Sequence, residues 1–169
     1  SKDEQLPQDK LKKKMLKTIH DYFIEKDRGY SFEKFAADII MYMDDAVASI
    51  DTTRPFKDGG FDAEGRYKIF KNVDNSIYVD FYVQAKCYAA DNAVRVPDTA
   101  RLISRIKDRQ FGIMITTSYV ADQAYKEVID DGHPIVFING RDIIEFVFNE
   151  LEIRSDSDLS KWLKNNYGD

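Results

Sequence analysis

Two short stretches of the sequence, "GGFD" and "QAK", carry residues whose types and spacing suit chemistry on a phosphate. Asp62 follows a glycine pair at the start of an expected strand, where a turn admits solvent and a closely approaching ligand. Gln84 and Lys86 alternate in a second expected strand, so both side chains project from one face, with Cα atoms about 6.6–6.8 Å apart. Carboxylate and amide oxygens are ligands for a hard cation, and an ammonium group can orient a water or stabilise a phosphate.

Each of these features also has a purely structural interpretation. An isolated Asp after a turn is most often a surface carboxylate without a role, and Glu64, on the same face as Asp62, is a rival candidate. Gln and Lys are ordinary residues on an exposed sheet face. Glu33, in the first turn of an expected helix, can favour the helix dipole and do nothing more.

The strand that holds Gln84 and Lys86 has a clear pattern. Its core face carries Phe81, Val83, Ala85 and Cys87, whereas the opposite face carries Asp80, Tyr82, Gln84, Lys86 and Tyr88. The sequence shows no protein partner for the polar row.

Apolar spacing predicts the elements that position these residues. Leu11, Met15, Ile19 and Phe23 recur every four residues, and Ser31 and Asp98 are candidate helix caps. The first ten residues are polar, and we expect them to fray. The pattern predicts helices over 11–26, 32–43, 96–110, 121–131 and 140–151, and strands over 61–70, 77–88, 111–120 and 134–138.

The order of these elements indicates the fold class. The earlier strands are linked as a hairpin and should be antiparallel. The later β-α-β-α order should give parallel neighbours through right-handed crossovers. An α/β fold follows, with a mixed sheet and helices on both faces.

Composition limits the function classes. The 169 residues suit one domain, and the formal net charge of −5 argues against gripping nucleic acid by bulk electrostatics. One cysteine excludes an internal disulfide and suits a reducing compartment, and two distant histidines leave little basis for a zinc site. No apolar run approaches the roughly 18 residues of a membrane span. The chain begins with Ser rather than Met, as an excised piece would, which leaves room for a partner domain outside this sequence.

The order of the motifs resembles the PD-(D/E)xK nuclease fold, and more closely its Mrr-like branch, in which Gln replaces an acidic residue of the second motif. The matching pieces are "FEKFAADII", "KDGGFDAEG", "FYVQAKCY", "FGIMITTSYVADQAYKEV" and "PIVFINGRDIIEF". They run from about Phe32 to Phe146. We accordingly divide the chain into an N-terminal helical extension, 1–30, and a restriction-endonuclease-like domain, 31–169.

The resemblance implies site residues at the matched positions. Asp62 would be the metal-binding carboxylate, Gln84 the second ligand, Lys86 the catalytic lysine and Glu33 the helix residue that completes the site. The metal would be Mg²⁺, with Mn²⁺ as a substitute. The first motif lacks the usual Pro-Asp pair and Gln84 is neutral, so we expect weak metal affinity unless Glu33 or Glu64 contributes.

The resemblance further implies cleavage of double-stranded DNA, as part of a prokaryotic, cytoplasmic restriction-modification enzyme that can depend on DNA modification. Because one site cuts one strand, we expect a homodimer or a larger multidomain enzyme, with recognition outside this domain. The DNA-contact candidates around the site are Arg54, Lys57, Arg66, Lys68, Thr116, Thr117 and Ser118. Further candidates, near the helix that follows the strand of Gln84 and Lys86, are Arg95, Arg101 and Arg105.

Other functions fit the same residues. A Holliday-junction or repair nuclease would use the same catalytic set on branched DNA, and relative cleavage of junctions and linear duplex separates the two. A non-catalytic DNA-binding module would retain the fold without the chemistry, and the presence of Asp62, Gln84 and Lys86 argues against it. An RNA substrate is a more remote alternative.

Overall fold

The computed structural model describes residues 1–52 and 61–169, except for the side chains of Phe61 and Asp62. The helices are α1 (Lys2–Gln5), α2 (Lys10–Asp27), α3 (Phe32–Met43), α4 (Val96–Arg105), α5 (Asp122–Asp130), α6 (Gly140–Asn149) and α7 (Asp156–Tyr167). The strands are β1 (Val47–Asp51), β2 (Phe61–Ile69), β3 (Ile77–Lys86), β4 (Phe111–Thr116) and β5 (Ile135–Ile138).

These strands form one mixed sheet in the order β1-β2-β3-β4-β5. β1, β2 and β3 are antiparallel, and β3, β4 and β5 are parallel. The order of elements predicts these directions for β2 to β5. Gly65 of β2 permits close packing, because a Cβ there would lie 2.1 Å from Cζ of Phe81. The α/β class with a mixed sheet is confirmed.

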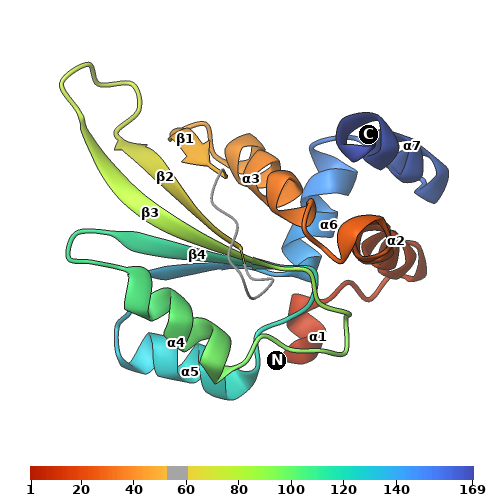
Figure 1. The fold of residues 1–169 in the computed structure, drawn as a ribbon, viewed down its shortest axis with the longest axis horizontal. Helices are drawn as coiled ribbons and strands as arrows, with labels where there is room; N and C mark the ends of the chain where they lie inside the picture. The colour runs from red at the N-terminus through yellow and green to blue at the C-terminus, as the bar shows by residue number, and fades with distance from the viewer. Residues whose placement is uncertain (53–60) are drawn as a thin grey trace.

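The helices cover both faces of the sheet (Figure 1). On one face, α2, α3, α6 and α7 form the main core with the side chains of Phe81, Val83, Ile113 and Ile115. On the other face, α4 and α5 form a smaller core that includes Leu102, Met114 and Ala124. The row of Tyr82, Gln84, Lys86 and Tyr88 faces this second layer, so it is not an open sheet surface.

The N-terminal region is more ordered than its polar sequence indicates. The Gln5 side chain donates to the backbone oxygen of Val120 at 3.0 Å and accepts from the Val120 N–H at 2.8 Å. The expectation that this segment frays is therefore wrong. In α2, Met15 and Phe23 belong to the main core, so the segment 1–30 packs with the domain to which we assigned 31–169.

Besides the short helix α1, the elements β1 and α7 are not predicted from the sequence. β1 is an edge strand in which only Val47 is buried, so it has almost no apolar alternation to detect. In α7, the buried residues Leu159 and Leu163 are four apart, and the Ser155 hydroxyl caps the helix by accepting from the Asp158 N–H at 3.1 Å. That signal was available in the sequence.

Candidate active site

The β2–β3 ladder brings the two motifs together. Asp62 and Gln84 are direct partners in the antiparallel pairing, so their Cα atoms lie about 4.5–5.5 Å apart and the two positions belong to the same face of the sheet. Lys86 lies two residues beyond Gln84 on that face. The glycine turn at Gly59-Gly60 and the side chain of Asp62 lie outside the described residues, so this placement of Asp62 rests on its backbone.

Gln84 is buried, and its side-chain oxygen has no hydrogen-bond partner among the described residues. Its side chain is 1% exposed, and Oε1 is the one buried side-chain nitrogen or oxygen in 1–52 and 61–169 that has no hydrogen-bond partner. Such an acceptor costs free energy unless a ligand satisfies it. An exposed sheet face, the bland interpretation of this glutamine, is therefore excluded.

Lys86 is also more buried than its position near a strand end indicates. Its side chain is 12% exposed, and its Nζ lies 3.7 Å from Oδ1 of Asp98 in α4. The expectation that Lys86 has no protein partner is therefore wrong. Asp98 itself caps α4 from the third helical position, where its Oδ2 accepts from the Arg95 N–H at 3.1 Å, rather than from the position before the helix.

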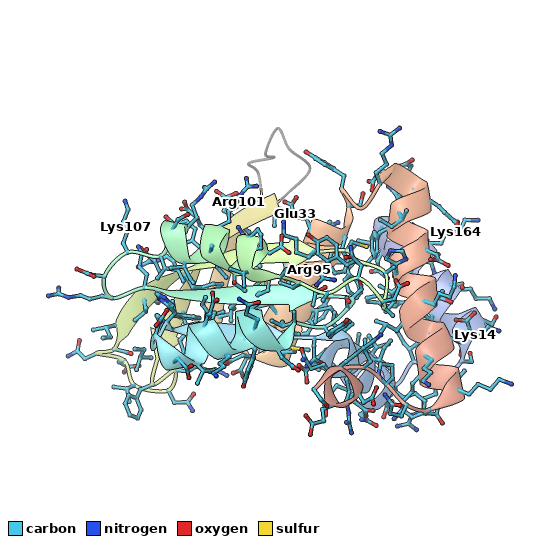
Figure 2. The ribbon with its side chains drawn as sticks, turned by 90° about the horizontal axis from the view of Figure 1, so that it is seen from below. Lys14, Glu33, Arg95, Arg101, Lys107 and Lys164 are labelled. Atoms are coloured by element: carbon cyan, nitrogen blue, oxygen red, sulfur yellow. The ribbon has the colours of Figure 1, made fainter. Side chains whose placement is uncertain are left out.

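Glu33 lies in the first turn of α3 and is buried. The α2–α3 turn lies against the end of β3, because a Cβ at Gly29 would lie 3.3 Å from Cβ of Cys87. Figure 2 shows Arg95 and Arg101 along α4, whereas Lys107 lies beyond the far end of that helix; α3, which carries Glu33, packs on the opposite face of the sheet (Figure 1). Glu33 is 7% exposed, and burial raises the pKa of its carboxyl from 4.5 to about 9. Without a bound cation, Glu33 is therefore neutral at pH 7.

Glu33→Gln is expected to stabilise the metal-free protein more at pH 8 than at pH 5. Between pH 4.5 and about 9 the folded state keeps a proton that the unfolded state releases, so the stability of the native protein falls as pH rises through this window. The amide removes that loss, which grows by about 1.4 kcal/mol per pH unit and so amounts to several kcal/mol at pH 8. Urea unfolding at the two pH values measures it, with the exposed Glu25→Gln as control. Equal changes at both pH values would contradict the buried-acid interpretation.

The hydroxyl residues after β4 do not face DNA. Thr116, Thr117 and Ser118 are at most 1% exposed. The Thr117 hydroxyl donates to the Tyr88 backbone oxygen at 2.6 Å, the Ser118 hydroxyl donates to that of Asn92 at 2.6 Å, and Thr116 Oγ1 accepts from the Ser118 N–H at 3.0 Å. The expectation that these three donate to DNA phosphates is wrong. They fasten the segment after β3 to the end of β4.

The cationic candidates differ in their surroundings. Arg66 is exposed on β2, with its guanidinium 4.3 Å from the Tyr78 ring centroid and its Nε 3.7 Å from Asp80. Lys68 is half-buried near the β2–β3 turn. Arg54 and Lys57 lie outside the described residues. DNA contact by any of these four stays a prediction.

A family model described as restriction endonuclease, Mrr_cat, matches residues 24–147. The chain belongs to this Mrr-type restriction endonuclease family. The resemblance drawn from "GGFD" and "QAK" is thereby confirmed. A comparison with curated protein sequences gives no match.

Two solved structures resemble the Mrr-type domain along almost its whole length. "DNA modification-dependent restriction endonuclease AspBHI" is 40% identical, with a TM-score of 0.86 over 98% of this chain and 42% of that one. "MspJI Restriction Endonuclease in Complex with 27-mer Oligonucleotide" is 23% identical, with a TM-score of 0.79 over 100% of this chain and 38% of that one, and shows the same fold. The chain spans about two fifths of each.

The residues of the Mrr-type domain fit a hard divalent cation. An oxygen acceptor that is buried without a partner, beside a carboxylate-bearing position of the neighbouring strand, is the donor chemistry that Mg²⁺ takes. No cluster of three or more His, Cys, Asp or Glu side chains suited to a metal occurs among the residues whose placement is described.

None of the helices within 1–52 and 61–169 combines the length and apolar content of a membrane span.

Proposed function

We propose that this chain is the catalytic domain of a DNA restriction endonuclease of the modification-dependent kind, which hydrolyses phosphodiester bonds with the help of a divalent cation. The observation that carries the proposal is the unpartnered Oε1 of Gln84, opposite Asp62 and two residues before Lys86. The 40% identity with AspBHI supports the substrate class.

The roles follow from the side chains. Asp62 and Gln84 supply oxygen ligands for Mg²⁺, or for Mn²⁺ in its place. When bound, the cation lowers the pKa of a water and polarises the scissile phosphate. Lys86 holds a positive charge at the same face, where it orients the attacking water and stabilises charge on the phosphate. Glu33 delivers a carboxyl group from α3 to this end of the sheet.

DNA contact beyond the reacting phosphate involves Arg66 and Lys68 on β2, and Arg54 and Lys57 before it. Contacts of this kind position the duplex and carry no sequence information. Because the net charge is −5, we assign recognition of sequence or modification to another domain or subunit. One site cuts one strand, so cleavage of both strands requires a dimer or a larger assembly.

Plasmid cleavage tests the proposal. Supercoiled DNA, with and without cytosine methylation, is incubated with the 169-residue protein in Mg²⁺, Mn²⁺ or EDTA, beside Asp62→Ala as negative control. We expect nicked circles with either cation, and none with EDTA or with the variant. Similar cleavage of methylated and unmethylated plasmid is the expected pattern for a domain that does not itself read the modification. Silence with both cations would contradict nuclease activity and favour a non-catalytic module.

A further inference from the structure

Asp98 contacts two long polar side chains at and just after the end of β3, those of Lys86 and Tyr88. Its Oδ1 lies 3.7 Å from Nζ of Lys86 and accepts a hydrogen bond from the Tyr88 hydroxyl at 3.1 Å. Its Oδ2 accepts the Arg95 N–H at 3.1 Å. The side chain of Asp98 is only 20% exposed. One carboxylate thus joins the start of α4 to the strand that carries the catalytic set.

The backbone around this contact is fixed along its length. The Lys86 backbone oxygen accepts the Thr117 N–H at 3.3 Å, and Thr117 also bonds to the Tyr88 backbone oxygen. Further on, the Val94 N–H donates to the Tyr119 oxygen at 2.8 Å. The segment from β3 to α4 is therefore hydrogen-bonded to the chain after β4 at several points. These bonds fix the position of Asp98 beside Lys86.

The separation within the pair matters for chemistry. At 3.7 Å, Nζ and Oδ1 form an ion pair but not a hydrogen bond, since N–H···O bonds measure about 2.7–3.2 Å. The three N–H donors of Lys86 are therefore not used up by Asp98 and stay available to a phosphate or a water. At the same time, the nearby negative charge restrains an otherwise flexible ammonium group.

We propose that Asp98 is a positioning residue for cleavage, which holds the Lys86 ammonium at the face shared with Asp62 and Gln84. The proposal rests on the proposed function, because it assigns Asp98 a role through Lys86. Pre-organisation of this kind matters because a small misplacement of a catalytic group costs orders of magnitude in rate.

A simpler interpretation is that Asp98 only caps α4. Asp98→Asn separates the two roles: the amide oxygen still accepts from the Arg95 N–H or the Tyr88 hydroxyl, but the charge that restrains Lys86 is gone. Asp98→Glu keeps the charge and the ability to cap from the third helical position. Asp142 offers a matched control, because it caps α6 from the same position by accepting the Asn139 N–H at 3.0 Å.

Single-turnover nicking of plasmid and Mn²⁺ binding are measured for the wild-type protein, Asp98→Asn, Asp98→Glu and Asp142→Asn. We expect Asp98→Asn to lower the cleavage rate about 10- to 100-fold, as loss of an outer-shell partner does elsewhere, with Mn²⁺ affinity and DNA KM changed less than about 3-fold. Asp98→Glu should recover a large part of the rate, and Asp142→Asn should cleave as the wild type does.

Several outcomes would overturn the proposal. A cleavage rate of Asp98→Asn within about 3-fold of the wild type leaves Asp98 a cap only, and equal losses in Asp98→Asn and Asp98→Glu show that charge is not what matters. Circular dichroism melting confirms that every variant is folded at the assay temperature, which is set below the melting temperature of the least stable variant. A wild-type protein that binds Mn²⁺ but never nicks contradicts the proposed function instead.

Discussion

Lys86→Ala is expected to lower DNA cleavage about 10³-fold or more, because it removes the ammonium group two residues from Gln84 on the same face of β3, where we place the reacting phosphate. Asp98 then loses its counter-ion, although it still accepts from the Tyr88 hydroxyl and the Arg95 N–H. We expect the free energy of unfolding to fall by about 1–3 kcal/mol, which leaves the protein folded at 25 °C. Single-turnover nicking and urea unfolding measure the two effects.

Lys107→Ala is the matched control for this substitution. Lys107 is exposed beyond the C-terminal end of α4, far from the start of that helix (Figure 2). The control should cleave as the wild type does. Full activity of Lys86→Ala would refute the assignment of Lys86, whatever the control shows.

Most of the fold could be predicted from the sequence, because apolar residues recur in most of its strands and helices with the period of that structure. β3 has a core face headed by Phe81 and Val83, and α3 begins and ends where the apolar run does, at Phe32 and Met43. β1 could not be predicted in this way, because an edge strand with one buried residue leaves no period to read. Elements that bury one face leave a periodic signal, and elements held mainly by backbone pairing do not.

The candidate site could be predicted only in part. The pairing of Asp62 with Gln84 follows from a hairpin register, and the sequence indicates that hairpin. The contact between Lys86 and Asp98 could not be predicted, because it joins a strand to a helix whose distance depends on how the intervening segment is fixed. The prediction that the hydroxyls of Thr117 and Ser118 contact DNA was wrong for the same reason. Small polar residues after a strand can bond to a ligand or to a neighbouring loop, and only the tertiary structure distinguishes the two.

Because the candidate site is buried, its polar residues lower the free energy of unfolding when no ligand is bound. Gln84 has a buried acceptor without a hydrogen-bond partner in the described part of the chain, and Glu33 has a buried carboxyl group whose pKa is raised to about 9. Neither arrangement favours folding on its own. Residues that weaken the protein without a ligand are expected where a ligand compensates for them, so stability and activity should respond in opposite directions to their replacement.

Gln84→Met tests that opposition most sharply. Methionine matches the length of glutamine and removes the buried acceptor, so the metal-free protein should be unchanged or more stable by about 1 kcal/mol. Loss of the oxygen ligand should weaken Mn²⁺ binding and lower cleavage at least about 100-fold, because loss of an outer-shell partner alone costs about 10- to 100-fold. Thermal melting, Mn²⁺ titration and plasmid nicking measure the three quantities.

Gln123→Met provides the control, since Gln123 is exposed on α5 and donates to Glu127 at 3.3 Å. It should leave cation binding and cleavage unchanged. A metal-binding role for Gln84 requires that the cation stabilise the wild type and Gln123→Met against heat but not Gln84→Met. If Gln84→Met binds Mn²⁺ and nicks DNA as the wild type does, its buried oxygen is not a ligand, and the cation would have to be held without any contribution from β3.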